Sequence, residues 1–274
     1  MNGFLRTVRE EKTPAGSAAV WWLGQMGLMI RLGETVLCVD YYASGSPDRR
    51  FLPPVPVDEV TDVDVFLGTH DHLDHMDHAA WRVWAKKCPN AFFVFPRAHL
   101  ASVLRDGVRK EKCLGMDDGE TLKIGNVTVR AVAAAHEFLR RDPASGAYPC
   151  LQYVIEGNGV RLYHAGDTLR YEGMLPKLKA LGPIDFALLP INGRDGERYR
   201  RDCIDNMTFQ EAADLAGELR PGLTVPGHWD MFANNSADPE AFADYLDAKY
   251  GGEVPCLIPK AASLIRVSAS GRAG

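Results

Sequence analysis

The stretch Gly68-Thr69-His70-Asp71-His72-Leu73-Asp74-His75 carries the strongest signal in this sequence. It follows the apolar run Val63–Leu67, which is typical of a buried strand. Three histidines and two aspartates fall within positions 70–75, although the 274-residue chain has only eight histidines. In an extended segment His70 and His72 point to the same side, and the pair Asp74-His75 can turn toward a neighbouring point. Imidazole and carboxylate groups at this spacing predict a site for two metal ions side by side.

This H-x-H-x-D-H pattern after a strand resembles the metal-binding signature of the metallo-β-lactamase superfamily. The resemblance implies an α/β fold, a four-layer αββα sandwich, in which later loops supply further metal ligands. The sequence has a candidate at each expected place, where a predicted strand gives way to a loop: His136, Asp167 and His228. The implied ligands are His70, His72 and His136 for one metal and Asp74, His75 and His228 for the other, with Asp167 as the bridge between them.

The implied ligand chemistry predicts an enzyme. Two divalent ions roughly 3.5–4 Å apart can share a hydroxide, lower the pKa of its parent water and clamp the oxygens of a substrate. Asp74 and Asp167 are therefore the expected catalytic carboxylates. Ligands without a thiolate suit Zn²⁺, Mn²⁺ or Fe²⁺, so the expected cofactor is two divalent ions of one of these kinds. An aspartate at position 167, where antibiotic-hydrolysing relatives carry a cysteine, argues against a β-lactam substrate.

Further motifs narrow the resemblance to the branch of the superfamily that contains the L-ascorbate-6-phosphate lactonases. The matching segments are Trp21–Gly24, Thr69–His75, Tyr163–Asp167, Pro226–Asp230 and Asn234–Pro239. That branch implies a hydrolase whose metal-bridging hydroxide opens the lactone of a small, phosphorylated and therefore anionic sugar acid. Related lactonases also imply a homo-oligomer.

Two alternatives stay open at this point. The same seven ligands serve phosphoryl chemistry elsewhere in the superfamily, so a metal-dependent phosphodiesterase is the first alternative. The second is a non-catalytic binding module that keeps the fold. Such a module is expected to have a degraded ligand set, whereas all seven candidates are present in this chain.

Composition and charge disfavour several classes of partner. The chain has 31 basic and 36 acidic residues, and the resulting net charge of −5 argues against a nucleic-acid partner. The apolar stretch Ala18–Ile30 is too short to span a bilayer, so no membrane association is expected. Six cysteines spread singly along the chain predict a reduced, cytoplasmic protein.

The pattern of apolar residues predicts a single domain over residues 1–274, with an irregular segment at 1–17 and two halves that each place strands before helices. The predicted strands are Ala18–Leu23, Met26–Arg31, Thr35–Asp40, Val63–Leu67, Leu122–Ile124, Val127–Val132, Leu151–Glu156, Val160–Tyr163, Asp185–Leu189 and Leu223–Val225, with closing strands near Cys256 and Ile265. The predicted helices are Asp77–Lys87, Arg97–Arg105, Leu169–Leu181, Thr208–Leu219 and Asp238–Tyr250. Gly125-Asn126 predicts a hairpin with a type I′ turn, and Gly157-Asn158-Gly159 predicts another hairpin.

The loop 192–201 is the candidate substrate-binding segment. It follows a predicted strand, contains Gly193 and carries Arg194, Arg198, Arg200 and Arg201. Asn192 and Arg194 are the residues expected to bind a phosphate or carboxylate of the substrate near the metals. The alternative is a solvated charged loop in which neighbouring carboxylates pair with the arginines.

A few other polar residues are candidates for support of the metal ligands. Asp40, His164 and Asp230 each lie near a predicted ligand or at a strand end, where a hydrogen bond could orient an imidazole or carboxylate. Each could equally serve as a structural cap or a buried polar residue. His78 and His99 lie in predicted helices and are expected to be structural.

Overall fold

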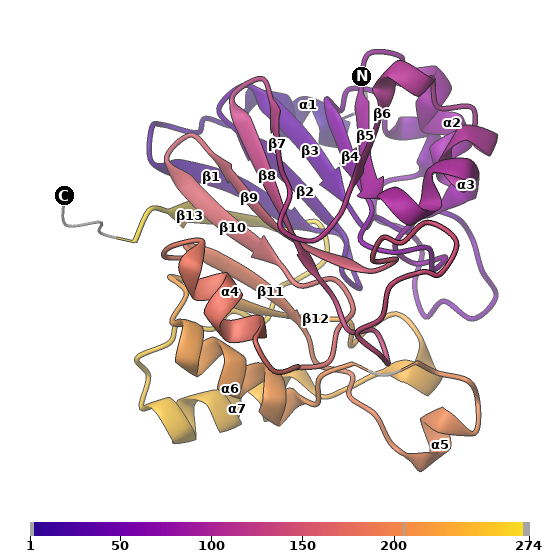
Figure 1. Ribbon diagram of the computed structural model, residues 1–274. Helices are drawn as coiled ribbons and strands as arrows, with labels where there is room; N and C mark the ends of the chain where they lie inside the picture. The colour runs from indigo at the N-terminus through magenta and orange to yellow at the C-terminus, as the bar shows by residue number, and fades with distance from the viewer. Residues whose placement is uncertain (1–2, 205, 271–274) are drawn as a thin grey trace.

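Two β-sheets face each other in the computed structural model, which describes residues 3–204 and 206–270 (Figure 1). Within these residues the first sheet has seven strands in the order β13-β1-β2-β3-β4-β5-β6. Their bounds are β1 Ser17–Trp22, β2 Leu28–Leu32, β3 Thr35–Val39, β4 Val65–Leu67, β5 Phe92–Pro96, β6 Cys113–Met116 and β13 Leu264–Ser268. The second sheet has six strands in the order β12-β11-β10-β9-β8-β7. Their bounds are β7 Thr121–Ile124, β8 Val127–Ala133, β9 Leu151–Gly157, β10 Val160–His164, β11 Phe186–Pro190 and β12 Thr224–Gly227.

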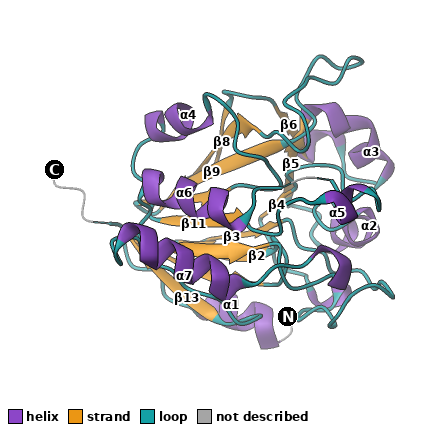
Figure 2. Ribbon diagram, turned by 90° about the horizontal axis from the view of Figure 1, so that it is seen from below, coloured by secondary structure: helices purple, strands orange, loops and turns teal. Residues whose placement is uncertain are grey.

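Helices cover the outer face of each sheet. The α-helices are α1 Gly3–Glu10, α2 His78–Lys87, α3 Leu100–Arg105, α4 Met174–Ala180, α5 Gly196–Tyr199, α6 Phe209–Leu219 and α7 Pro239–Tyr250. Short 3-10 helices are η1 Val57–Glu59, η2 Arg97–His99, η3 Lys110–Lys112 and η4 Ala233–Asn235. Figure 2 shows the strands between the helices. No helix in the described part of the chain has the length and apolar character needed to cross a membrane.

Three apolar clusters hold these layers together. One lies between the two sheets and includes Leu28 and Leu188. A second packs the outer face of the seven-stranded sheet against α1, α2 and α3, and a third packs the six-stranded sheet against α4, α6 and α7. Because both faces of each sheet are covered, central strands such as β2 and β11 are buried along their whole length. The expected four-layer αββα sandwich is confirmed.

Local sequence signals explain several element boundaries. Helix α6 begins at a capping box, because the Thr208 hydroxyl accepts from Glu211 N (3.3 Å) and the Glu211 carboxylate accepts from Thr208 N (3.0 Å). Both predicted hairpins form, as β7–β8 and β9–β10. In the first turn only Gly125 has a positive φ (58°), so the predicted type I′ turn, which needs two such residues, is wrong.

The N-terminal segment differs from its prediction. Residues 1–17 were expected to be irregular, but helix α1 occupies Gly3–Glu10; residues 1–2 lie outside the described residues. Leu5 and Val8 lie one helical turn apart and are fully buried against the seven-stranded sheet. This packing stabilises a helix that its short polar sequence does not predict.

Four further elements also differ from expectation. The helix expected over 169–181 begins only at Met174, because Leu169 N donates to Ala135 O (2.8 Å) and keeps the preceding segment in a loop. Strands β5 and β6 were not predicted. The expected strand near Cys256 is reduced to an isolated bridge with Thr224.

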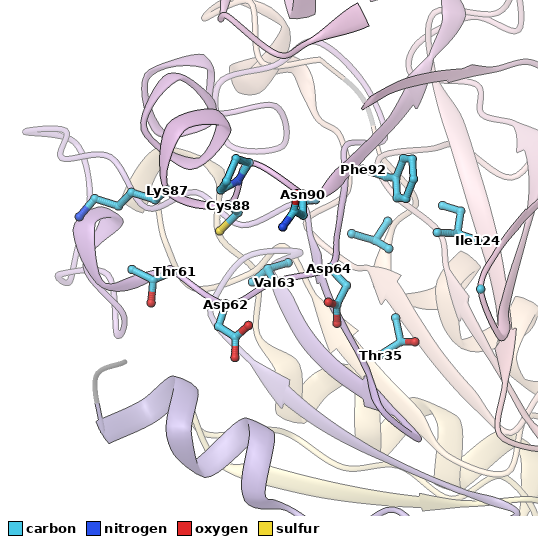
Figure 3. A pocket seen from close by; sticks show the side chains of 14 residues that line it. Thr35, Thr61, Asp62, Val63, Asp64, Lys87, Cys88, Asn90, Phe92 and Ile124 are labelled. Carbon is cyan, nitrogen blue, oxygen red and sulfur yellow. The ribbon is translucent and has the colours of Figure 1, made fainter. Parts of the chain in front are cut away.

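Strand direction decides which edge of the sandwich carries the candidate site. Strands β8 and β10 both run antiparallel to β9, and β10, β11 and β12 are mutually parallel, so their carboxyl ends meet at one edge. A cavity of about 550 Å³ lies at the amino ends of β3, β4 and β5. It is lined by residues such as Thr35, Asp64 and Phe92 (Figure 3). None of the seven candidate metal ligands lines that cavity.

Candidate metal centre

The loop after β4 is anchored at its first residues. Gly68 leaves no room for a side chain, since a Cβ there would lie 2.4 Å from Met76 Cγ. Thr69 N donates to Asp40 Oδ1 (2.8 Å), and the Thr69 hydroxyl donates to Asp40 Oδ2 (2.5 Å). His75 Nδ1 lies 2.7 Å from the same Oδ2, which directs Nε2 of His75 away from Asp40. The suggestion that Asp40 supports this loop is confirmed.

Three other loops bring the remaining candidates to the same place. His136 follows β8, Asp167 follows β10 and His228 follows β12. The loops after β4 and β10 approach closely, because a Cβ on Gly166 would lie 2.8 Å from the Thr69 Cβ. A positive φ of 56° also suits glycine at this position.

All seven candidate ligands belong to clusters of three residues. Within each cluster the ligand atoms lie within 4.8 Å of one another. The clusters are His70, His72 and His136; His70, His75 and Asp167; and Asp74, His75 and His228. Asp167 lies between the two outer clusters. Its Oδ1 is 3.3 Å from His75 Nε2, and its Oδ2 is 3.0 Å from His228 Nε2 and 3.8 Å from His136 Nε2.

Three buried polar atoms among the candidate ligands indicate a ligand-binding site. His70 Nε2, His75 Nε2 and Asp167 Oδ1 are buried, and none has a hydrogen-bond partner within the described residues. Imidazole nitrogens and carboxylate oxygens that face one another in this way suit divalent metal ions. The residues therefore fit a metal centre. Its two outer clusters, which share no residue, suit two ions.

The electrostatics of the site favour a positive charge at its centre. Although burial opposes it, His228 and His75 hold the pKa of Asp167 well below its usual range. Burial alone would lower the pKa of His228, but Asp167 and Asp74 raise it to about 9. Burial together with His75 and His136 lowers the pKa of His70 well below its usual value. An ionised Asp167 and a neutral His70 are the protonation states that metal binding requires, whereas His228 carries a proton that a bound ion would displace.

A cavity of about 190 Å³ opens onto these clusters. It is lined by His72, Asp74, His136, Asp167, Asp202, Cys203, Ile204, His228 and Asn235. None of these lining residues is a lysine or an arginine. The cavity thus combines carboxylate, imidazole and amide groups with the thiol of Cys203 and the apolar side chain of Ile204.

The predicted substrate-binding residues lie outside the cavity lining. Arg194 donates from both terminal nitrogens to the carboxylate of Glu211 (2.6 and 2.7 Å). Asn192 is buried, accepts from Asn206 Nδ2 (3.0 Å) and donates to Asn235 Oδ1 (2.8 Å). Direct substrate contact by Asn192 and Arg194 stays a prediction, and these contacts do not favour it. Asn192 instead supports Asn235, which does line the cavity.

Two residues that contact the candidate ligands were missed in the sequence. Asn206 Nδ2 donates to Asp167 Oδ2 (2.9 Å), and Gln25 Nε2 donates to Asp74 Oδ2 (2.9 Å). Asparagine and glutamine have no distinctive spacing in this chain. Gln25 lies in a turn and Asn206 in an irregular segment, both far in sequence from the ligands they touch. The only available signal was that Gln25 is a polar residue inside an otherwise apolar stretch.

The other support candidates have structural partners. His164 Nε2 lies 2.8 Å from Met26 O, so it braces backbone rather than a candidate ligand. Asp230 accepts from Gln25 N (2.9 Å). His78 and His99 contact Asp71 and neither belongs to the clusters of candidate ligands, which agrees with their expected structural role.

Fold and donor set together define a metal-dependent hydrolase of the metallo-β-lactamase superfamily. Residues 39–229 match the family described as the beta-lactamase superfamily domain, and the chain belongs to that family.

Individual relatives show how far the similarity extends. The chain is 28% identical over 272 residues to a protein of Salmonella heidelberg named "Probable L-ascorbate-6-phosphate lactonase UlaG", with 85% of this chain and 75% of that protein covered. The fold of this chain is similar to that of Igni18, a metallo hydrolase of Ignicoccus hospitalis, with a TM-score of 0.72 at 19% identity. The match covers 91% of this chain and 98% of Igni18. The fold is also similar to that of CmlA, a diiron β-hydroxylase of Streptomyces venezuelae, with a TM-score of 0.68 at 18% identity over 93% of this chain and 55% of that one. The two structural similarities concern the fold alone.

Proposed function

We propose that this protein opens the lactone ring of a small sugar acid by hydrolysis at a centre of two divalent metal ions. The observation that carries the proposal is the convergence of seven histidine and aspartate side chains beside a cavity, with buried ligand atoms that have no hydrogen-bond partner among the described residues. The name of the Salmonella relative supports a lactone as the substrate. The proposed ligands are His70, His72 and His136 for one ion and Asp74, His75 and His228 for the other, with Asp167 between them.

Two bound divalent ions would supply an activated water and polarise the carbonyl oxygen of the ring. The chain's own residues position these groups. Asn206 holds Asp167 by a hydrogen bond to Oδ2 (2.9 Å), which fixes the carboxylate between the two clusters. Asn235 Oδ1 accepts from Asn192 Nδ2 (2.8 Å) and Arg198 Nε (3.3 Å), so its Nδ2 is the group that can donate to a substrate oxygen.

The charge of the cavity bears on the substrate. Because no lysine or arginine among the described residues lines it, an anionic group of the substrate would be bound by the metal ions and by amide donors such as Asn235. A small phosphorylated sugar acid remains the proposed substrate class, and the unphosphorylated lactone is the informative comparison.

Opening of the lactone ring tests the proposal. Protein loaded with Mn²⁺ or Zn²⁺ is mixed with L-ascorbate 6-phosphate or with its unphosphorylated lactone, L-ascorbate, and ring opening is followed by the loss of ultraviolet absorbance of the conjugated ene-diol. We expect this loss with the wild type and not with Asp167→Ala, which removes the carboxylate between the clusters.

Bis-p-nitrophenyl phosphate is the comparison substrate for the phosphodiesterase alternative. Efficient turnover of this diester without lactone opening would contradict the proposed lactonase while leaving a metal-dependent hydrolase. Bound metal without hydrolysis of lactones, esters, thioesters or phosphodiesters would instead favour the binding-module alternative.

A further inference from the structure

Gln25 lies in the turn between β1 and β2 and is completely buried. Its backbone is held by three hydrogen bonds. The N–H donates to Asp230 Oδ1 (2.9 Å), and the carbonyl oxygen accepts from Trp22 Nε1 (3.0 Å) and from His228 N (3.1 Å). The turn is thereby fixed directly beside one of the proposed ligands.

The side chain of Gln25 reaches two proposed ligands of the same ion. Its Nε2 donates to Asp74 Oδ2 (2.9 Å) and lies 3.1 Å from Nε2 and 3.3 Å from Nδ1 of His228. Asp74 Oδ2 and His228 Nε2 are themselves 3.4 Å apart. The carboxamide therefore lies against Asp74 and His228, which form one cluster of candidate ligands with His75.

This arrangement is unfavourable for the stability of the folded chain. The φ of Gln25 is 54°, in the left-handed region that disfavours residues with a side chain. Its Oε1 is buried and has no hydrogen-bond partner among the residues that the structure describes. A glycine would adopt this φ without strain, and an apolar side chain would leave no unpaired oxygen. Unfavourable features of this kind concentrate at functional sites.

We propose that Gln25 is a positioning residue of the metal centre, whose carboxamide holds Asp74 and His228 ready to bind the second ion. The inference rests on the metal centre proposed above. A hydrogen bond to Asp74 Oδ2 restricts rotation of the carboxylate, and contact with the His228 ring restricts the imidazole. Removal of a group that orients metal ligands typically weakens metal binding 10–100-fold.

Metal titration of chelator-stripped protein tests this role. Isothermal calorimetry with Mn²⁺ or Zn²⁺ gives the Kd of each of the two sites in the wild type and in Gln25→Leu. We expect binding to weaken about 10–100-fold at one site and to be unchanged at the other. His228→Ala and His136→Ala identify the sites, and the site weakened in Gln25→Leu is expected to be the one lost in His228→Ala.

Two more variants separate hydrogen bonding from packing and strain. Gln25→Gly removes the backbone strain together with the side chain, so its metal-free form is expected to stay folded while the same site is weakened. Gln25→Met keeps the length of the side chain but removes both N–H donors without adding charge, so it is also expected to weaken that site.

Gln152→Leu is the matched control. This carboxamide is equally buried, donates to Ala133 O (2.7 Å) and accepts from the Tyr163 hydroxyl, without a hydrogen bond to a proposed ligand in the described structure. We expect it to lower the Tm of the metal-free protein and to leave both Kd values unchanged.

The outcomes are distinct. Wild-type affinity at both sites in Gln25→Leu and Gln25→Gly would overturn the positioning role, and so would retained affinity in Gln25→Met. Binding of fewer than two ions by the wild type would contradict the metal centre itself, before any variant is compared.

Discussion

A single buried carboxylate, Asp40, orients the loop that supplies four of the proposed ligands. It accepts hydrogen bonds from the Thr69 backbone and hydroxyl and pairs with Nδ1 of His75. Because Nδ1 is engaged, Nε2 of His75 faces Asp74 and Asp167. The position of Asp40 at a strand end made it a candidate in the sequence. The contact between Asp40 and His75 could not be predicted from the sequence, because it depends on the pairing of β3 with β4.

Arg194 forms an ion pair with Glu211 outside the cavity lining. Its guanidinium is bound to the Glu211 carboxylate, which also caps helix α6 through Thr208 N. Both side chains are about one third exposed (34% and 33%), so Arg194→Ala is expected to lower the free energy of unfolding by only about 0.5–1 kcal/mol. Because the side chain does not line the cavity, KM for phosphorylated and unphosphorylated lactones is expected to be unaffected.

Denaturant unfolding and steady-state kinetics of Arg194→Ala check both parts of this prediction. A rise in KM confined to the phosphorylated substrate would show that the arginine leaves Glu211 to bind the anion. Unchanged kinetics with a small loss of stability would agree with a structural ion pair.

Helix α2 is linked to the loop after β4, which carries four of the proposed ligands, by the side chain of His78. His78, the first residue of α2, pairs with Asp106 through Nδ1 and with Asp71 through Nε2 (2.5 Å). Hydrogen bonds to Asp106 and then Asp71 raise the pKa of His78 from 6.5 to about 9. A raised pKa stabilises the fold fully below the pKa of the unfolded chain and progressively less as pH rises through the folded value.

The stability contributed by His78 is therefore expected to be present below pH 6.5 and lost between about pH 6.5 and 9. Urea unfolding of wild type and His78→Gln across pH 6–10 measures it. The difference in free energy of unfolding is expected to shrink as pH rises through that window. A difference that stays constant with pH would show that His78 is not protonated in the folded protein.

Elements with strong local signals were predicted and those that depend on packing were not. The capping box at Thr208 and the Asp77 cap of α2 identify helix starts in the sequence alone. Strand β6 contains Gly115 and is mostly half-buried, so it has no clear alternating pattern. Helix α1 places Leu5 and Val8 on one face but has only eight residues, too few to form a stable helix in isolation. Both elements form because they pack or pair with β5 and the seven-stranded sheet.

On the scale of the whole molecule, the two sheets create the proposed centre together. The seven-stranded sheet supplies the loop after β4, and the six-stranded sheet supplies His136, Asp167 and His228 from the ends of β8, β10 and β12. Each candidate was visible as a polar residue after a strand. The contacts of Gln25 and Asn206 could not be predicted, because they depend on how separate turns meet once the sheets have packed.

Anomalous diffraction from crystals grown with Mn²⁺ or Zn²⁺ tests the proposed two-metal centre most directly. The expected result is two peaks per chain, roughly 3.5–4 Å apart. One peak should be bound by His70, His72 and His136, the other by Asp74, His75 and His228, with Asp167 contacting both. A single peak, no peak, or peaks held by other residues would contradict the centre proposed for this protein.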